Sequence, residues 1–434
     1  MQPVPAARGR YPSPRARRMR VVALTLLMVA GTVNYLDRSA LSIGNSSIRA
    51  SLHLSDTQMG LLLSSFAVAY GLAQLPVGIL IDRYGPRRLM SLGLMLWSAA
   101  QILAGFVGGL GQFVLARAAL GIGESPMYLA GTKVCSNWFQ ASARAFPIGL
   151  FNASSALGPA IAPPVLTALL LAFGWRSMFV IIGVAGLLVA VLWSLLYRDP
   201  EQHNIAADEQ HWIHAEDATV HPSDRAGWRS VFRDRTSWGM ATGFIGVIYL
   251  TWLYGAWLPD YLQRARHLSL AQSGLWTTVP QACGFLGALL GGLASRTLAR
   301  HGAAPVASCR LPLVLAMLVT GACTAGAGLV HGTATAILLV SIALFAGSLA
   351  SSCGWAMAAV ATTPDKVATL EAFQNVGGSI GAAIAPALTG WIVQATGSFT
   401  PGLLLAAAIS IATAAIYQFG THDRPGAPTK ELQT

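Results

Sequence analysis

The chain has 434 residues, of which 54% are hydrophobic and only 10% are charged, and its formal net charge is +11. An ordinary soluble domain is about 25% charged, so this composition excludes a soluble protein and indicates an all-α membrane protein with many spans. Much of the positive charge lies in short segments beside apolar runs, where it governs topology, so we expect no nucleic-acid partner. The five cysteines are scattered through apolar stretches without metal-ligand spacing.

Residues 1–20 carry six arginines and no acid. Positive charge before a first span is retained on the cytoplasmic side, so this segment is predicted to be a disordered cytoplasmic tail. The apolar run that follows is too long for a cleaved signal peptide and has no small-residue cleavage site.

Twelve apolar runs of about 20 residues, the length that crosses a bilayer, follow the tail. They predict twelve transmembrane helices in two pseudo-symmetric six-helix bundles, at 21–198 and 236–420, with a second cytoplasmic tail at 421–434. The predicted spans are 21–48, 56–81, 87–108, 110–138, 141–172, 175–197, 237–264, 270–298, 306–330, 333–361, 366–394 and 399–419.

Residues 199–235 interrupt this pattern. They hold eight of the seventeen acids, four arginines and four histidines. A segment of this polarity predicts a cytoplasmic linker between the two halves.

The halves resemble an internal repeat. The stretch NASSALGPAIAP at 152–163 matches NVGGSIGAAIAP at 375–386, and Asn, Gly and Ala-Ile-Ala-Pro coincide at one constant offset. The stretches fall in the fifth and eleventh predicted spans. Parallel repeats of this kind are typical of transporters whose binding site lies between the halves near the midplane.

An acid and a base, Asp37 and Arg38, stand in the first span beside Tyr35. A charge near the bilayer centre costs between about 2.5 and about 17 kcal/mol, depending on the method, and neighbouring helix positions do not face each other. Each charge therefore needs another partner. The pair indicates an ion-coupled binding site, unless it lies at the membrane edge and reaches water there.

Arg117 and Glu124 form a second charged pair, in the fourth span. Seven residues are almost two helical turns, so the two side chains share a face about 10 Å apart along the axis. Gly121 and Gly123 leave that face open for another helix or a ligand. A common cavity for both charges is one interpretation, and a purely structural ion network is the other.

Such charges suit coupled transport. Desolvation raises the pKa of a carboxyl group and a nearby arginine lowers it, while an arginine offers a planar fork to a substrate carboxylate. If substrate and protein carboxylates compete for one arginine, protonation of the protein acid releases the arginine, which links proton and anion binding.

Two further acids lie in predicted spans. Asp260 is expected at the outer membrane interface. Glu371 precedes Asn375 by one turn, and is either a first-turn acid of the eleventh span or a carboxylate that faces the site.

The loop between the second and third spans reads Gly78-x-x-x-Asp82-Arg83-x-Gly85-x-Arg87-Arg88. Glycine permits a tight turn, and an acid here can pair with a neighbouring helix. We expect Asp82, Arg83 and Arg87 to form a gating latch on the cytoplasmic side. Polar side chains elsewhere complete a candidate site: Tyr70, Asn152, Ser155, Ser352, Trp355 and Asn375.

With these motifs, nearly the whole chain resembles the major facilitator superfamily and, within it, the anion:cation symporter family. That family includes bacterial proton-coupled carriers of galactonate, glucarate and hexuronates, and its animal relatives include sialin and the vesicular glutamate transporters. The residues that carry the resemblance are those at 34–38, the 78–88 loop, Arg117 with Gly121-x-Gly123-Glu124, Phe151-Asn152, the 199–203 loop, Trp257-Leu-Pro259, Gly354-Trp355 and Asn375.

The resemblance implies roles for these residues. Asp37 and Glu124 would be the proton-coupling acids, and Arg38 with Tyr35 and Tyr70 would engage the substrate carboxylate. Arg117 would tune the protonation and gating of Glu124. The hydroxylated part of the substrate would be contacted from the second half, by Ser352, Trp355 and Asn375.

The chain also departs from the family. Sugar-acid members tend to carry a glutamine where Ser155 stands, galactonate-like carriers have a hydroxyl residue at Gly354, and Glu371 occupies a usually small position. These departures leave the particular sugar acid open, but not the anion class.

The sequence therefore predicts a monomeric, multi-pass protein of the inner (plasma) membrane with both termini cytoplasmic. It would be a proton-coupled symporter that imports a small organic anion by alternating access. A sugar acid or a related carboxylate is the favoured substrate. We expect no cofactor besides the coupling protons, and no enzymatic activity. Two alternatives remain. An efflux antiporter of the same fold would be distinguished by the direction of proton-linked flux. A ligand sensor that does not transport would bind a ligand but fail to accumulate it in vesicles.

Overall fold

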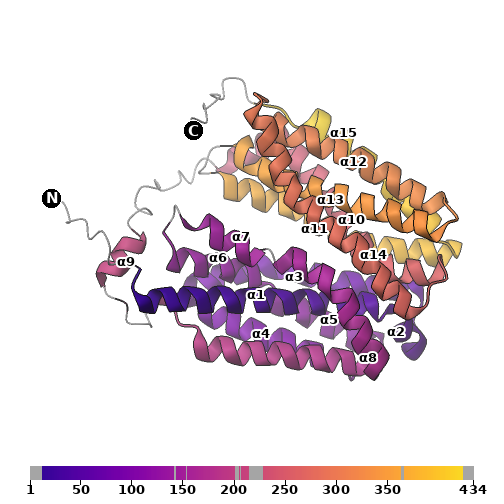
Figure 1. The fold of residues 1–434 in the computed structure, drawn as a ribbon, viewed down its shortest axis with the longest axis horizontal. Coiled ribbons are helices and arrows are strands. Elements are labelled where there is room, and N and C mark those ends of the chain that lie inside the picture. Colours follow the sequence, from indigo (N-terminus) through magenta and orange to yellow (C-terminus); the bar gives the residue numbers. More distant parts are fainter. Residues whose placement is uncertain are drawn as a thin grey trace.

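The computed structural model describes residues 12–140, 143–152, 154–200, 205, 207–214, 228–362 and 366–423. Their regular structure is helical throughout, and the two halves of the chain form two groups of helices that lie side by side (Figure 1). The first group contains α1 (Pro14–Ile43), α2 (Asn45–Leu52), α3 (Asp56–Tyr84), α4 (Pro86–Ala104), α5 (Leu110–Glu124), α6 (Pro126–Trp138), α7 (Ala145–Asn152) and α8 (Ser154–Leu196). The second contains α10 (Arg235–Arg264), α11 (Leu270–Arg300), α12 (Pro305–Leu329), α13 (Thr333–Ala361), α14 (Val367–Thr396) and α15 (Thr400–Gly420). Between them lie α9 (Ala207–His214) and the short 3-10 helix η4 (Trp228–Arg233).

Nine helical segments of the described residues are long and apolar enough to cross a membrane. One of them, 146–196, contains two predicted spans, because α8 has a non-helical residue at Gly174, with φ 77° and ψ 166°. The predicted boundary between the fifth and sixth spans falls at this glycine. With α4 and the consecutive α5 and α6 added, each of the twelve predicted spans has a helix, so the all-α prediction is confirmed.

The repeated sequence lies in equivalent places in the two halves. A Cβ built on Gly158 of α8 would lie 2.3 Å from Cβ of Tyr35 in α1, and one built on Gly381 of α14 would lie 2.2 Å from the Ile245 carbonyl oxygen in α10. In each half, therefore, the repeat glycine lets its helix pack tightly against the first helix of that half. At both repeat glycines this close contact leaves no room for a larger side chain.

The expected disordered tail is wrong for residues 14–20, which begin α1. Ser13 Oγ accepts a hydrogen bond from the Ala16 amide at 3.3 Å, and proline follows at the first helical position, where its missing N–H costs nothing. The Ser13 amide in turn donates to Glu209 Oε1 of α9 at 2.8 Å. Helix α9 thus caps one end of the first half, here called the α9 end; residues 1–11 lie outside the described chain.

The two halves are joined near the opposite, α2 end. Helix α3 of the first half runs antiparallel along α14 of the second: the Thr57 amide donates to Gln394 Oε1 at 3.0 Å, and the Ala387 amide donates to Ser64 Oγ at 3.1 Å. Ser42 Oγ of α1 donates to the Ala256 carbonyl of α10 at 2.8 Å. These contacts hold the halves together at the α2 end.

Candidate functional site

Arg38 and Glu124 form the central ion pair of the first half. Arg38 Nε donates to Glu124 Oε2 at 2.7 Å, and the Glu124 side chain is 0% exposed against 17% for Arg38. The structure thus brings together two charges that lie 86 residues apart in the chain. Among the described residues, Arg38 Nη2 and Glu124 Oε1 have no hydrogen-bond partner. Arg38 retains part of its fork for a further carboxylate.

Asp37 and Arg117 lie beside this pair. Arg117 is 2% exposed, and its Nη1 donates to the backbone carbonyl of Asp37 at 3.3 Å rather than to a carboxylate. Asp37 is 0% exposed, and neither of its carboxylate oxygens has a hydrogen-bond partner in the described part of the chain. A buried carboxylate without a partner is stable only if it is protonated or if its charge is offset nearby. Two acids and two arginines therefore meet inside the first half.

The predicted tyrosines surround Arg38. Its guanidinium carbon lies 5.2 Å from the ring centre of Tyr35 and 4.9 Å from that of Tyr70. The two tyrosine rings come from different helices, α1 and α3, and the fold brings them together at Arg38.

The two glycines before Glu124 allow neighbouring helices to pack closely against α5. A Cβ on Gly121 would meet the Phe66 carbonyl oxygen of α3 at 2.7 Å, and a Cβ on Gly123 would meet the Trp97 amide of α4 at 2.6 Å. Of the two expected uses, close helix packing is the one observed. It brings the break between α5 and α6, and with it Glu124, against α3.

The second half contributes a more dispersed set. Trp355 of α13 is 40% exposed and packs edge-on against Phe244 at 5.1 Å between ring centres. Ser352 Oγ donates to the Ala288 carbonyl of α11 at 2.8 Å, and Asn375 Nδ2 of α14 donates to Gln74 Oε1 of α3 at 3.2 Å. Asn375 thus bridges the two halves directly.

Asn152 and Ser155 lie where α7 meets α8. Asn152 is exposed, and its backbone carbonyl accepts a hydrogen bond from Ser155 Oγ at 2.7 Å. Gly158, one turn further on, packs against Tyr35. Both residues therefore lie on the segment that adjoins the tyrosine side of Arg38, without a recorded contact to it among the described residues.

The charged residues of the predicted latch make contacts within the first half. Lys133 Nζ of α6 pairs with Asp82 Oδ1 at 3.0 Å, Arg83 lies over the neighbouring Tyr84 ring, and Arg87 Nη2 donates to the Ser194 carbonyl of α8 at 2.9 Å. Gly85 forms the expected tight turn, with φ 83°. In this structure the loop ties together α3, α4, α6 and α8.

Asp260 lies one turn before the end of α10, and its side chain is 0% exposed at the junction of the halves. Arg264 Nη1 lies 3.3 Å from Asp260 Oδ2 and 2.5 Å from Asp56 Oδ1 of the first half. Arg49 Nη1 of α2 joins from the other side, 2.7 Å from Asp56 Oδ1 and 3.8 Å from Asp260 Oδ2. We call these four residues the α2-end ion network.

Glu371 is half-buried in the second turn of α14, whose first turn contains no acid. The first-turn interpretation is therefore wrong, because α14 begins at Val367 and its N-cap is Lys366.

Several residues of the site were missed from the sequence. Phe66 is a buried aromatic next to Arg38, and the half-buried Tyr128 stacks on Phe151. Gln374 is 0% exposed, and its Nε2 donates to the Gly354 carbonyl at 3.2 Å. Aromatic residues in apolar runs carry no distinguishing signal, but Gln374, a polar residue inside a span next to Asn375, was visible in the sequence.

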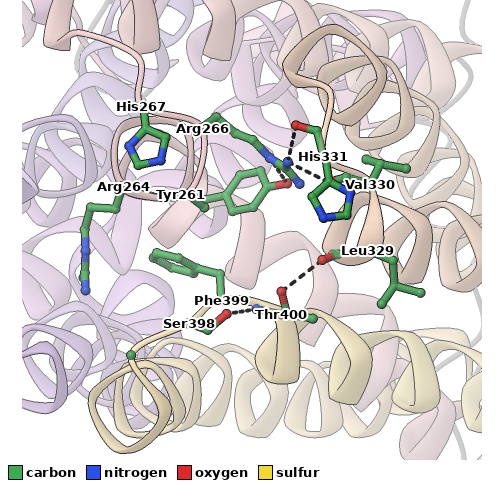
Figure 2. A pocket seen from close by; sticks show the side chains of 13 residues that line it. Tyr261, Arg264, Arg266, His267, Leu329, Val330, His331, Ser398, Phe399 and Thr400 are labelled. Carbon is green, nitrogen blue, oxygen red and sulfur yellow. Dashed lines mark hydrogen bonds between the residues drawn. The ribbon is translucent and has the colours of Figure 1, made fainter.

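A cavity of about 370 Å³ lies elsewhere, at the α2 end of the second half (Figure 2). Arg266 dominates its wall, but its Nε donates to the Tyr261 hydroxyl at 2.9 Å and its Nη2 to the Ala327 carbonyl at 2.7 Å. It also donates to the Val330 carbonyl at 2.7 Å. The arginine thus fastens the loop after α10 to the end of α12, and the cavity contains none of the predicted site residues. In the described chain, no group of three or more His, Cys, Asp or Glu side chains is arranged to hold a metal ion.

Comparison with known proteins gives consistent matches over most of the chain. The family model of the Major Facilitator Superfamily matches residues 27–369. The chain is 41% identical over 421 residues to the probable L-galactonate transporter of Escherichia coli (strain K12), covering 96% of this chain and 93% of that protein. It is 32% identical over 405 residues to the hexuronate transporter of Bacillus subtilis (strain 168), covering 92% and 94%. The crystal structure of a bacterial homolog to the human lysosomal transporter Spinster, in an inward-facing and occupied conformation, matches with a TM-score of 0.79 at 20% identity, over 93% of this chain and 97% of that one.

Proposed function

Because this chain belongs to the Major Facilitator Superfamily, a family of transporters and not of enzymes, we propose that it is a proton-coupled symporter that imports a sugar acid or a related carboxylate. The names of its relatives, an L-galactonate and a hexuronate transporter, support the substrate class. The observation that carries the proposal is the Arg38–Glu124 pair at 2.7 Å beside the unpaired, buried Asp37.

The substrate carboxylate and the carboxylate of Glu124 compete for Arg38. In the unprotonated carrier Glu124 occupies the guanidinium of Arg38. Protonation of Glu124 removes the charge that holds the arginine, so that the fork turns to the substrate carboxylate. The free energy of proton binding is thereby linked to that of anion binding. Asp37, buried at 0% exposure one residue away, is the second proton site.

The second half would bind the hydroxylated part of the substrate. Asn375, Ser352 and Trp355 offer an amide, a hydroxyl and a ring edge, which suit a hydroxylated carbon chain better than a carboxylate. Asn375 already contacts Gln74 across the halves. A substrate that replaces this contact and reaches Arg38 draws the halves together, so its binding energy goes to the closed state.

In alternating access, the end at which the two halves are joined is the closed side of the carrier. The α2-end ion network and the α3–α14 contacts close the α2 end. With the N-terminus cytoplasmic, the α9 end faces the cytoplasm and the α2 end faces outward in the inner (plasma) membrane. This state is closed to the outside, and the carrier acts as a monomer with protons as its only coupling ion and no other cofactor.

Ligand-induced thermal stabilisation of the purified protein tests the binding half of this proposal. A ligand at 100 times its Kd stabilises a protein by about 2.7 kcal/mol, enough to raise the melting temperature measurably. L-galactonate, D-glucuronate and D-glucarate are compared with the neutral sugars galactose and glucose. Stabilisation by at least one acid and by neither sugar is expected. Equal shifts for acids and neutral sugars, or none for any acid, would contradict the proposed substrate class.

A further inference from the structure

Phe66 of α3 is in contact with both arginines of the site. The guanidinium carbon of Arg38 lies 4.9 Å from the centre of the Phe66 ring, and that of Arg117 lies 5.1 Å from it. Phe66 itself is 0% exposed. A desolvated cation over an aromatic face is held by the negative face of the ring, more strongly than in water.

This support matters because Arg117 has no direct ion-pair partner among the described residues. It is 2% exposed, and no carboxylate in the described part of the chain pairs with it within 4.0 Å. Its recorded polar contact is the Asp37 carbonyl at 3.3 Å. The same ring that orients Arg38 for a substrate thus also stabilises the second buried cation, and keeps the two like charges at fixed positions.

The Phe66 ring is itself held from both halves. It stacks on Tyr70 of the same helix, with 5.6 Å between ring centres and 20° between planes, and on Trp252 of α10, with 6.0 Å and 25°. Trp252 packs against two hydrophobic clusters, one within the first half and one that includes residues of both halves. Any motion that parts α10 from α3 removes one of the two stacking partners of Phe66.

We infer that Phe66 is a positioning residue that orients Arg38 for the substrate and holds Arg117 in place beside it, and that Trp252 makes this orientation depend on contact between the halves. Phe66 touches no substrate and acts through the arginines. The inference rests on the proposed function, since it assigns Arg38 to a substrate carboxylate.

Ring fluorination tests the role of Phe66 without removing its volume. Phe66 is replaced by phenylalanine carrying one, two or three fluorine atoms, which withdraw the charge of the ring face stepwise. The matched control is the same series at Phe113, which is also 0% exposed in the first half and packs on Trp175 and Phe179. Uptake of the stabilising acid is measured as KM and kcat.

At position 66 the KM is expected to rise with each fluorine, to between about 3-fold and 30-fold for the last, the range to which cation–π energies convert, with kcat changed much less. At position 113 no trend is expected. Phe66→Leu should match or exceed the largest rise, and Phe66→Tyr should restore most of the affinity. A flat series at position 66, or the same trend at both positions, would overturn the role of Phe66.

Trp252 is tested in the same assay. Trp252→Leu is expected to raise KM in the same direction, and Trp252→Phe, which keeps a stacking ring, is expected to restore it. Wild-type KM in Trp252→Leu would overturn the cross-half part of the inference. If the wild-type protein takes up no acid, the proposed function itself fails and this inference fails with it. If the wild type and the Phe113 series transport normally, only the role of Phe66 is at stake.

Discussion

At the scale of single side chains, the two buried acids of the site have opposite surroundings. Glu124 has a charged partner at 2.7 Å, whereas the carboxylate of Asp37 has none in the described chain. Removing one partner of a buried ion pair costs about 3–5 kcal/mol, because the other charge is left uncompensated. An amide in place of an unpaired carboxylate has no such cost. The two acids, alike in sequence, should therefore respond differently to neutralisation.

We predict that Glu124→Gln lowers the melting temperature of the purified protein and that Asp37→Asn leaves it unchanged or raises it. Both variants should lose proton-driven accumulation of substrate, and at least one should retain exchange without a gradient, because a neutral side chain mimics the protonated carrier. Thermal unfolding in detergent, with uptake and counterflow in vesicles, measures these effects. Equal loss of stability in both variants, or concentrative uptake by both, would contradict this assignment.

Arg38→Lys should weaken substrate binding nearly as much as Arg38→Ala. Lysine is a point charge and does not reproduce the planar guanidinium fork that binds a carboxylate through two parallel hydrogen bonds. We expect a loss of roughly 1.5–3 kcal/mol, the scale of a charge-assisted hydrogen bond. Binding is measured by ligand-induced stabilisation, with Arg176→Lys as control, because Arg176 donates to the Gly105 and Val107 carbonyls of its own half and lies over the Trp175 ring. Near-normal affinity in Arg38→Lys would show that the residue supplies positive potential alone.

At the scale of helices, closure of the α2 end depends on how closely α3 and α14 approach. A Cβ on Gly60 would lie 2.5 Å from the Pro386 carbonyl oxygen, whereas one on Gly71 would lie 3.5 Å from the Ser379 side chain. The first distance forces backbone atoms apart and the second is ordinary contact. Gly60→Ala should therefore reduce uptake strongly and Gly71→Ala should leave it near the wild-type rate. Equal uptake by the two variants would show that the α3–α14 contact does not limit transport.

The α2-end ion network makes a second prediction at this scale. Asp260→Asn should loosen the junction of α2, α3 and α10, because Arg264 and Arg49 then share a single acid, Asp56. Ser42→Cys in a cysteine-free background, at a position now 3% exposed, reports the opening. A membrane-impermeant thiol reagent added outside should label it faster with Asp260→Asn than without it. Glu209→Gln, at the α9 end, serves as control and should not alter the rate.

At this same scale the sequence predicted the helices well and their partners poorly. The predicted boundary between the fifth and sixth spans, for example, coincides with Gly174, the residue with non-helical φ and ψ inside α8. Asp260, in contrast, pairs with Arg264 one turn later in α10 and with Arg49 of the other half. Likewise, Phe66 looked like any aromatic in an apolar helix. Pairing across halves is a property of the folded chain, whereas helix breaks and charges inside spans are local.

At the scale of the whole molecule, the two halves contribute different chemistry. The four charges of the candidate site, Asp37, Arg38, Arg117 and Glu124, belong to the first half. Asn375, with Ser352 and Trp355, brings uncharged polar groups from the second. A substrate that carries a carboxylate at one end and hydroxyls along its length matches this division.

Asn375→Ala should accordingly discriminate between substrates. It should weaken a hydroxylated sugar acid by about 1–3 kcal/mol, the cost of polar groups left unpaired, and hardly affect a deoxy analogue of the same acid. Competition between the hydroxy and deoxy compounds for uptake measures the difference. Equal losses for both would mean that Asn375 serves only to hold Gln74 of α3.

The central claim, coupling of sugar-acid import to protons, is tested most directly in proteoliposomes with a pH-sensitive dye inside and the labelled acid outside. With the outside acidic, the acid should accumulate above its equilibrium level while the interior acidifies in parallel, and Asp37→Asn should abolish both signals together. Accumulation that requires an acidic interior would indicate exchange of the acid for protons. Binding of the acid with no accumulation in either gradient would contradict transport altogether.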